Sequence, residues 1–310
     1  MYDVLIVGEG IASFSAALHA AQKKLAVQVL ADPAQGEQAE GERISYPGYP
    51  GKGRAQLLAH MRKQAEEAGA VVVEARNRLE SIFFRQEGNH EIFVLGDGEG
   101  NAYEGRSVIV ASGKKPRRLG IPGEAELLGK GVAYDIRGEP PLFEGKVVAV
   151  VGAGETGLDA ALQLSRRAGK VYVLEIGDRP QGDEQAREKL AQAKNAELVV
   201  NAAVQKILGA ETVRGVVFTD KTTGEERELA ADIVVVAIGA SPDSDFLKGF
   251  CDLNQWGEVI INPRTNATSH VGVFAAGEVT DIPEKEAIIS AGEGAKAALS
   301  CAKWLTQQKL

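Results

Sequence analysis

Residues 2–13 are YDVLIVGEGIAS, and residues 146–157, KVVAVVGAGETG, repeat the same pattern. In each stretch an apolar run ends at a glycine and leads into an alanine-rich segment, which predicts a strand, a tight turn and a helix. Further apolar runs at residues 26–30 and 171–174 predict another strand after each helix. The sequence therefore predicts an α/β protein built from two Rossmann-like, three-layer ββα dinucleotide-binding domains.

The segments that follow each copy predict where the chain passes between the domains. Residues 107–113, SVIVASG, form a buried strand run that leads into KKPRRLGIPG, a segment rich in proline, glycine and charge. Residues 233–239, IVVVAIG, have the same character and precede SPDSD. The C-terminal remainder is too short for a third such domain. We therefore expect a discontinuous first domain, residues 1–115 and 243–310, with residues 116–242 inserted into it as the second domain.

The first glycine turn has the G-x-G-x-x-small pattern of a dinucleotide-binding loop. Its first glycine permits the tight turn, and its second lets backbone N–H groups approach a pyrophosphate at a helix N-terminus. The expected contacts in this turn are Gly8, Gly10, Ile11, Ala12 and Ser13. Asp32 ends the next apolar run and is a candidate for the adenosine ribose; the alternative is a turn cap before Pro33.

The second glycine turn repeats the pattern with a full third glycine. Glu175 ends the strand that follows, where a carboxylate accepts hydrogen bonds from ribose hydroxyls. We expect this domain to bind a nucleotide through Gly152, Gly154, Glu155, Thr156, Gly157, Glu175 and Gly239.

Composition excludes several other classes of protein. The 310 residues are 44% hydrophobic and 25% charged, as expected of a soluble two-domain protein. The net charge of −8 leaves no basic surplus for nucleic acid or anionic lipid. The N-terminus lacks a basic segment and its apolar run breaks at Gly8, so we expect no signal peptide or membrane span and a cytoplasmic protein. The only cysteines, Cys251 and Cys301, form no CxxC, and we expect no metal site or disulfide framework.

Seven blocks of sequence, in order and from end to end, resemble the low-molecular-weight thioredoxin reductase family of two-domain flavoproteins. They are GEGIAS, YPG, VIVASGKKPRRLGIPGE, GKGVAYDIRG, VVAVVGAGETGLDAALQL, VVAIGASPDSDFL, and GVFAAGEVTD with AIISAGEGAKAAL. The resemblance implies FAD in the first domain, a nicotinamide nucleotide in the second, and a homodimer. It also implies a domain rotation that alternates access to the flavin between two electron partners.

The resemblance also implies FAD contacts beyond the first glycine turn. Glu278 stands where the family has an aspartate that contacts the ribityl or pyrophosphate region, and a helix near Ala287 would direct its positive end at the flavin. Lys285 and Glu286 replace the family's usual Arg-Gln pair. The implied contacts are Ala111, Ser112, Gly113, Gly277, Glu278, Glu286 and Ala287.

The redox dithiol of the family is missing. Asp135 and Gly138 occupy the positions of its two cysteines, and neither side chain can attack a disulfide as a thiolate does. Thioredoxin reduction by the family mechanism is therefore not expected, and Cys301 has the helical spacing of a packed residue. Glu139 aligns with the family's proton donor, the alternative being a solvated loop carboxylate. Asp135 is a second catalytic candidate, as part of a polar mouth to the flavin with Arg137.

Nucleotide choice is the other departure from the family. Glu175-Ile176-Gly177 replaces the His-Arg-Arg run that reads the 2′-phosphate of NADPH. A carboxylate repels that phosphate and accepts from a free hydroxyl, which favours NADH. The alternatives are the adenosine ribose of a second FAD and a vestigial site.

These observations predict an FAD-dependent NAD(P)H oxidoreductase that passes electrons from flavin directly to an unknown acceptor. Candidate acceptors are ferredoxin, flavodoxin, a quinone or another small oxidant, and relatives without the dithiol include ferredoxin reductases. The alternative is a flavin- and nucleotide-binding protein, a redox sensor or subunit, that NAD(P)H does not reduce. A disulfide reductase that uses the cysteines of a partner is a third reading.

Overall fold

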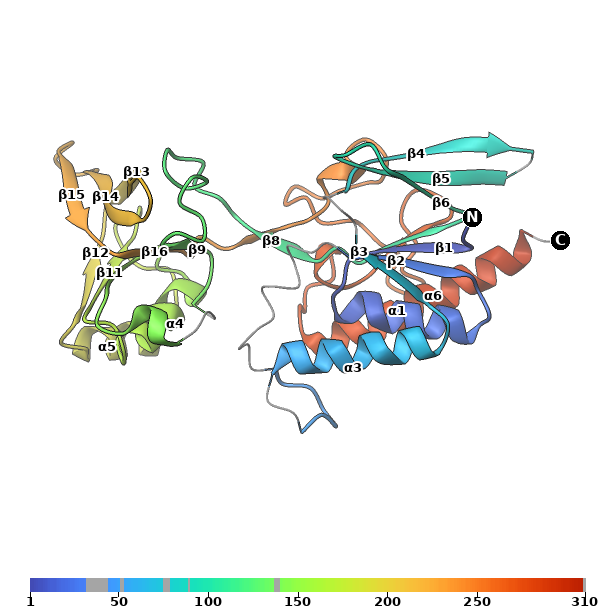
Figure 1. Cartoon of the computed structure of the whole chain (residues 1–310), viewed down its shortest axis with the longest axis horizontal. Coiled ribbons are helices and arrows are strands. Elements are labelled where there is room, and N and C mark those ends of the chain that lie inside the picture. The colour runs from blue at the N-terminus through green and yellow to red at the C-terminus, as the bar shows by residue number, and fades with distance from the viewer. Residues whose placement is uncertain (32–43, 51–52, 75–78, 89, 137–139, 309–310) are drawn as a thin grey trace. The chain divides into compact units, whose positions relative to one another are not determined.

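The computed structural model describes residues 1–310 except 32–43, 51–52, 75–78, 89, 137–139 and 309–310. The chain divides into two compact units. The first unit comprises Met1–Lys115 and Ser241–Leu310, and the second, Pro116–Ala240, is inserted into it (Figure 1). The short strands β8 (Lys114–Pro116) and β17 (Ala240–Pro242) pair where the chain crosses from one unit to the other.

The first unit is built on a five-stranded parallel sheet with the order β18-β7-β1-β2-β3. Its strands are β18 (Val273–Ala275), β7 (Val108–Val110), β1 (Val4–Val7), β2 (Val27–Ala31) and β3 (Val71–Glu74). The central strand β1 is entirely buried and entirely apolar, because both faces of the sheet are covered.

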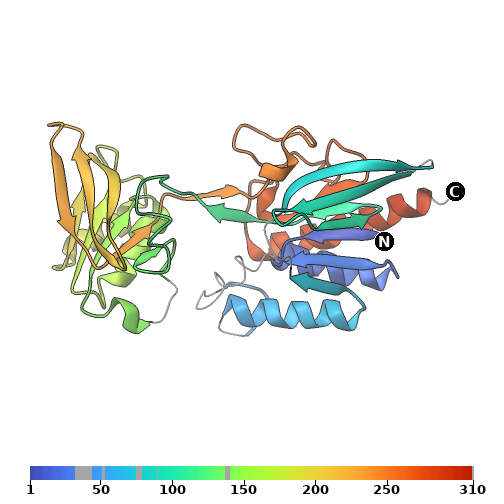
Figure 2. The same ribbon diagram turned by 45° about the horizontal axis from the view of Figure 1, so that its top comes forward.

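Helices cover one face of this sheet and a small antiparallel sheet covers the other (Figures 1 and 2). The helices are α1 (Ile11–Gln22), α3 (Arg54–Glu67) and α6 (Ala287–Gln307). The antiparallel strands are β4 (Leu79–Glu87), β5 (His90–Asp97) and β6 (Ala102–Gly105). The result is the three-layer ββα arrangement that the sequence predicts.

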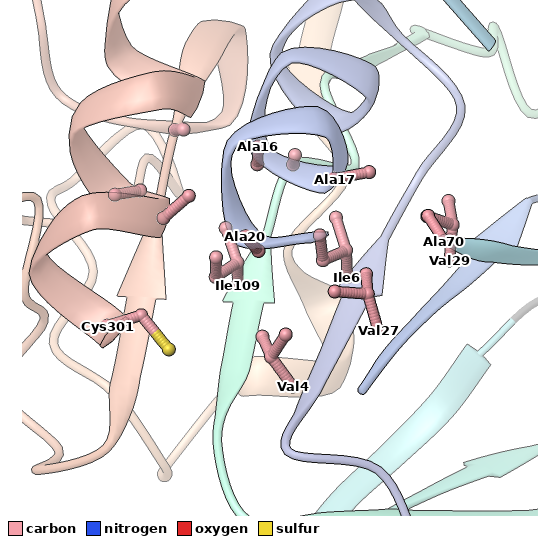
Figure 3. Close-up of a cluster of buried hydrophobic side chains, with 14 of the residues drawn as sticks. Val4, Ile6, Ala16, Ala17, Ala20, Val27, Val29, Ala70, Ile109 and Cys301 are labelled. Atoms are coloured by element: carbon pink, nitrogen blue, oxygen red, sulfur yellow. The ribbon is translucent and has the colours of Figure 1, made fainter. Parts of the chain in front are cut away.

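Small side chains let α1 and α6 pack closely over the sheet. Ala16, Ala17 and Ala20 of α1 lie over Ile6 of β1, and Cys301 of α6 joins the same buried cluster (Figure 3). A β-carbon on Gly294 of α6 would lie 2.1 Å from the carbonyl oxygen of Ala12, so glycine is required there. This close contact fixes the N-terminal halves of the two helices beside each other.

The second unit repeats the same layers. Its parallel sheet has the order β12-β11-β10-β16-β9, with strands β12 (Ala196–Val199), β11 (Lys170–Leu174), β10 (Val147–Val151), β16 (Ile233–Val236) and β9 (Val132–Ala133). Its helices are α4 (Glu155–Leu164) and α5 (Glu184–Gln192). Its antiparallel strands are β13 (Ala202–Gly209), β14 (Val213–Asp220) and β15 (Glu226–Ala230). The predicted fold class, with two dinucleotide-binding folds, is confirmed.

Several element boundaries differ from the sequence prediction. Helix α1 begins at Ile11, directly after an extended Gly10, whereas the alanine pattern predicted a start at Ser13. Helix α5 and the strands β12 to β15 were not predicted from the sequence. Single turns of 3₁₀ helix occur at Pro140–Phe143, Asp245–Leu247 and Gly277–Val279, the last of which is η4. No helix in the described part of the chain is both long and apolar enough to cross a bilayer.

Candidate functional site

The first glycine turn is shaped by a close approach to β7. Gly8 has φ +112°, and a β-carbon there would lie 2.3 Å from the carbonyl oxygen of Ala111. The Ser13 hydroxyl donates a 2.5 Å hydrogen bond back to the carbonyl of Gly8. Among the described residues, a β-carbon on Gly10 would have no atom within 4 Å, so none of them fills the space above the turn. A backbone held this way can receive a ligand at close range.

The helices that begin at this edge of the sheet have no side-chain cap. Neither Gly10 before α1 nor Glu286 before α6 provides a capping hydrogen bond. In contrast, α5 in the second unit is capped by Asp183, whose carboxylate accepts from the N–H of Ala186 at 3.0 Å. The first-turn N–H groups of α1 and α6 thus leave room for an external anion or carbonyl, which the helix dipole favours.

The N-terminal turns of α1 and α6 meet at one small apolar cluster. Ile11 and Ala291 are buried in it, and Ala287 packs against it. Tyr46 and Tyr49 pack against the same cluster, which places two aromatic rings beside the predicted flavin helices. In the sequence Tyr46 belongs to the family block YPG, but the sequence patterns predict neither ring as a site residue.

The end of β7 continues into a braced turn. The Ser112 hydroxyl donates to the carbonyl of Asp243 at 2.6 Å, and the N–H of Asp243 donates to the carbonyl of Gly113 at 2.9 Å. Lys115 pairs with Asp243 at 3.4 Å and also with Asp245. Hydrogen bonds from Lys115 and Lys248 hold the pKa of Asp245 far below its ordinary value.

The end of β18 passes into η4, which carries Gly277 and Glu278. Gly277 has φ +79°, and a β-carbon there would lie 2.9 Å from that of Ala12. Parallel strands end at the same edge of a sheet, so β1, β7 and β18 bring Gly8, Gly113 and Gly277 to one edge.

Lys285 and Glu286, which directly precede α6, differ in the contacts of their side chains. The Lys285 ammonium pairs with Glu258 at 3.0 Å and donates to the carbonyl of Thr280. Burial raises the pKa of Glu258, but hydrogen bonds from Asn254 and Lys285 outweigh it and leave the pKa below its usual value. Glu286 is exposed, and its carbonyl accepts from the N–H of Ser290.

The described residues of the first unit fit a dinucleotide. The close turn at Gly8, the space at Gly10 and two uncapped helix starts provide a cradle of N–H donors in which no described side chain stands in the way. Asp32, the candidate for the adenosine ribose, lies outside the described residues. The individual FAD contacts stay predictions.

The second glycine turn has the same construction. Gly152 has φ +103°, and its β-carbon would lie 2.6 Å from the carbonyl oxygen of Ala237, while one on Gly157 would lie 2.0 Å from the carbonyl oxygen of Gly152. A β-carbon on Gly154 would have no described residue within 4 Å, and Gly154 precedes α4 without providing a side-chain cap. Glu155 and Thr156 are exposed in the first turn of α4.

The side chain of Glu175 is hydrogen-bonded to this turn. Its Oε2 accepts from the N–H of Ala153 at 2.8 Å, and its Oε1 accepts from the N–H of Gly177 at 2.8 Å. The side chain is buried, with 7% of the residue exposed, and each carboxylate oxygen retains a second lone pair. Gly239, after β16, has φ +91° and accepts from the N–H of Arg117.

The catalytic candidates are only partly within the described residues. Asp135 follows β9, whereas Arg137, Gly138 and Glu139 lie outside the described residues. The neighbour of Asp135, Tyr134, donates to Glu124 at 3.1 Å. Burial, then the charge of Glu124, raises the pKa of Tyr134. The catalytic roles of Asp135 and Glu139 stay predictions.

Glu124 is a buried residue that the sequence patterns did not single out. Its carboxylate also accepts from the N–H groups of Leu119 and Gly120, at 2.9 and 2.7 Å. Its place at the end of the block VIVASGKKPRRLGIPGE is the one signal in the sequence that could have drawn attention to it.

The two cysteines are both buried free thiols. Cys301 belongs to the cluster under the helices, and Cys251 to the cluster on the other face of the sheet. Burial raises the pKa of Cys301 to about 12 and also raises that of Cys251. Neutral thiols on opposite faces of a sheet cannot act as a redox pair.

Two ββα units, each with a glycine turn before an uncapped helix, define a protein of the two-dinucleotide-domain class. The chain belongs to the pyridine nucleotide-disulphide oxidoreductase family, whose sequence profile matches residues 2–298. This membership implies FAD and a pyridine nucleotide as cofactors.

Similar proteins support the same family. The F subunit of alkyl hydroperoxide reductase from Pseudomonas putida is 35% identical over 305 residues, covering 96% of this chain and 57% of the relative. NADH dehydrogenase of Bacillus subtilis is 34% identical over 307 residues, covering 98% and 58%. The chain thus spans less than two thirds of the length of these relatives.

Solved structures support the fold. Thioredoxin reductase of T. acidophilum has a TM-score of 0.78 and 31% identity, covering 97% of this chain and 98% of that one. Thioredoxin reductase of Lactococcus lactis has a TM-score of 0.82 at 24% identity, covering 99% and 100%. The predicted thioredoxin reductase-like architecture is confirmed, and this chain carries it without a CxxC.

Proposed function

We propose that this chain is an FAD-dependent oxidoreductase that takes electrons from a reduced pyridine nucleotide and delivers them to an acceptor without a dithiol of its own. The observation that carries the proposal is the combination of two nucleotide cradles with two buried, neutral thiols that lie on opposite faces of a sheet. Thiol–disulfide exchange requires an accessible thiolate, so the family's dithiol relay has no counterpart here.

The first unit would hold FAD. The turn at Gly8 and the start of α1 would bind the pyrophosphate, η4 with Glu278 would contact the ribityl region, and the start of α6 would face the flavin ring. Bound FAD supplies the capacity to accept a hydride and to release electrons in one- or two-electron steps. The protein contributes orientation and the field of the α6 N-terminus, which favours negative charge at that point.

The second unit would bind NADH in preference to NADPH. Glu175 stays an acceptor with lone pairs to spare after its two backbone hydrogen bonds, which suits ribose hydroxyls and opposes a 2′-phosphate. The name of the Bacillus subtilis relative, NADH dehydrogenase, agrees with this preference.

The candidate electron acceptors are ferredoxin, flavodoxin, a quinone and another small oxidant. The relatives named as the F subunit of alkyl hydroperoxide reductase add a peroxide-reducing system to these candidates. A homodimer remains the expected assembly, to be checked by sedimentation of the purified chain.

The test is an anaerobic titration of the FAD-loaded protein with NADH and NADPH separately, followed by the flavin absorbance near 450 nm. We expect fast bleaching by NADH and slow bleaching by NADPH. A flavin that is bleached by dithionite but by neither nucleotide would overturn the proposal.

That second outcome would instead support a flavin- and nucleotide-binding protein without NAD(P)H oxidation. The feature that favours this alternative is Lys285, whose ammonium is engaged by Glu258 and the carbonyl of Thr280. The side chain in the position of the family's arginine is therefore occupied within the first unit.

A further inference from the structure

A buried polar pair lies beneath η4 in the first unit. Thr280, which follows η4, is completely buried, and Glu293, two turns into α6, is 5% exposed. No catalytic or binding role above uses either side chain. A buried polar group destabilises the folded state unless it is hydrogen-bonded, so the stability of this pair depends on the hydrogen-bond partners of Thr280 and Glu293.

Both hydrogen-bond donors of Thr280 converge on one carbonyl. The Thr280 hydroxyl donates to the carbonyl oxygen of Gly277 at 2.8 Å, and the Thr280 N–H donates to the same oxygen at 3.0 Å. The hydroxyl also lies 3.4 Å from Oε2 of Glu293, so its one proton is shared between a near and a more distant acceptor. Glu293 is therefore a second, more distant acceptor for the hydroxyl that holds Gly277, and it connects α6 to the residue that follows η4.

The other oxygen of Glu293 faces a cation. Oε1 lies 3.5 Å from Nζ of Lys296, one turn along α6, and that ammonium donates to the carbonyl of Pro263 at 2.6 Å. The buried carboxylate therefore has a counter-charge and connects α6 to η4 on one side and to the loop at Pro263 on the other.

Fixing the carbonyl of Gly277 also fixes the next N–H group. The peptide is trans and planar, so the N–H of Glu278 points opposite to the carbonyl of Gly277. Because that carbonyl is held against Thr280, the Glu278 N–H points away from the buried pair. Gly277 itself has a left-handed conformation, with φ +79°, which glycine adopts without strain, so the hydrogen bonds to its carbonyl set the direction of this peptide.

We propose that Glu293 and Thr280 are positioning residues for FAD, which hold η4 so that Glu278 presents its N–H to the dinucleotide. The inference rests on the proposed function, since it assumes that FAD binds at this edge of the first unit. It assigns a role to two side chains that do not themselves touch the cofactor.

The test compares FAD affinity of the full-length apoprotein and its variants, measured by titration with quenching of flavin fluorescence. Thr280→Val keeps the shape and removes the hydroxyl, and Glu293→Leu removes the acceptor. Each should weaken FAD binding by about tenfold, the effect of one lost hydrogen bond. Glu293→Gln retains an oxygen for Thr280 and should stay within about threefold of wild type. The double variant Thr280→Val/Glu293→Leu should bind FAD no more weakly than whichever single variant has the lower FAD affinity, because the two residues act as one unit.

Glu124→Gln is the matched control. Glu124 is an equally buried carboxylate in the second unit, so its replacement should lower the unfolding midpoint and leave FAD affinity unchanged. Normal FAD affinity in both Thr280→Val and Glu293→Leu overturns the positioning role while leaving the proposed function intact. The role also fails if their weakened binding is fully explained by the unfolded fraction of the apoprotein, measured in urea. Wild-type protein that binds no FAD at all overturns both the inference and the proposed function.

Discussion

The carboxylate of Glu175, which directly follows β11, accepts a 2.8 Å hydrogen bond from the N–H of Ala153 inside the second glycine turn. Its other oxygen accepts from Gly177 at the same distance. One residue therefore shapes the turn that precedes α4 and presents acceptor lone pairs at the place where a nucleotide ribose is expected. The structural and the binding role can be separated by experiment.

Glu175→Gln keeps the shape of the side chain but has only one oxygen for two N–H donors. One buried N–H then faces an amide N–H₂ group, so we expect the unfolding free energy of the second unit to fall by about 1–3 kcal/mol. Urea unfolding measures this loss, and a nucleotide titration measures the accompanying weakening of NADH binding. Asp178→Asn, at an exposed position close by, is the control and should change neither quantity. Wild-type stability in Glu175→Gln would contradict the role of the two hydrogen bonds.

Gly8 and Gly10 allow a paired test of the first cradle. Gly8→Ala places a methyl group 2.3 Å from the carbonyl oxygen of Ala111 at a positive φ, so we expect a loss of about 3 kcal/mol or more in stability. The methyl group of Gly10→Ala meets no atom of the described residues, so the variant should fold with near wild-type stability while binding FAD more weakly, because the methyl group enters the cradle. Thermal unfolding of the apoprotein and FAD titration separate the two effects. Equal FAD affinity in Gly10→Ala and wild type would remove the first turn from the FAD site.

The glycine turns were predictable because their cause is local. Gly8 and Gly152 each follow an apolar strand and take a positive φ that other residues rarely adopt, so the sequence itself marks the turn. The start of α1 was predicted two residues late. Ile11 and Ala12 are buried in the first turn of the helix, and a pattern of alanines does not reveal that packing.

The supporting contacts were not predictable because they join distant segments. Thr280 and Glu293 are thirteen positions apart, and Glu258 and Lys285 twenty-seven apart, and their contacts depend on how α6 packs on the sheet. No periodic pattern marks such pairs. The same is true of Tyr46 and Tyr49, whose position beside Ile11 follows from the packing of a loop on two helices.

The ion pairs of Asp245 predict a dependence of stability on pH. Lys115 and Lys248 lower the pKa of Asp245 in the folded protein, so its stabilising contribution is present above about pH 4, the ordinary value, and is lost as the pH falls toward the folded pKa. Because this carboxylate is half exposed, Asp245→Asn should cost only about 0.5 kcal/mol near neutral pH. Urea unfolding across the acid range should show the two proteins converging as the pH falls. High salt should reduce the difference at neutral pH, and a difference that grows in acid would contradict the assignment.

The two cysteines give the sharpest test of a mechanism without a dithiol. Cys301 has a pKa raised to about 12 by burial, and Cys251 is also buried with a raised pKa, so both are neutral thiols near pH 8. We expect iodoacetamide to leave the native protein unmodified and to label two thiols after denaturation. The double variant Cys251→Ala/Cys301→Ala should lose about 1 kcal/mol of stability for each buried sulfur and keep wild-type bleaching of the flavin by NADH. The Ser107 hydroxyl near Cys301 stays satisfied in that variant, because it donates to the carbonyl of Asp3 at 2.7 Å. A folded, FAD-loaded double variant that NADH no longer reduces would show that a thiol takes part in the electron path, and the proposal of direct transfer from flavin would then be wrong.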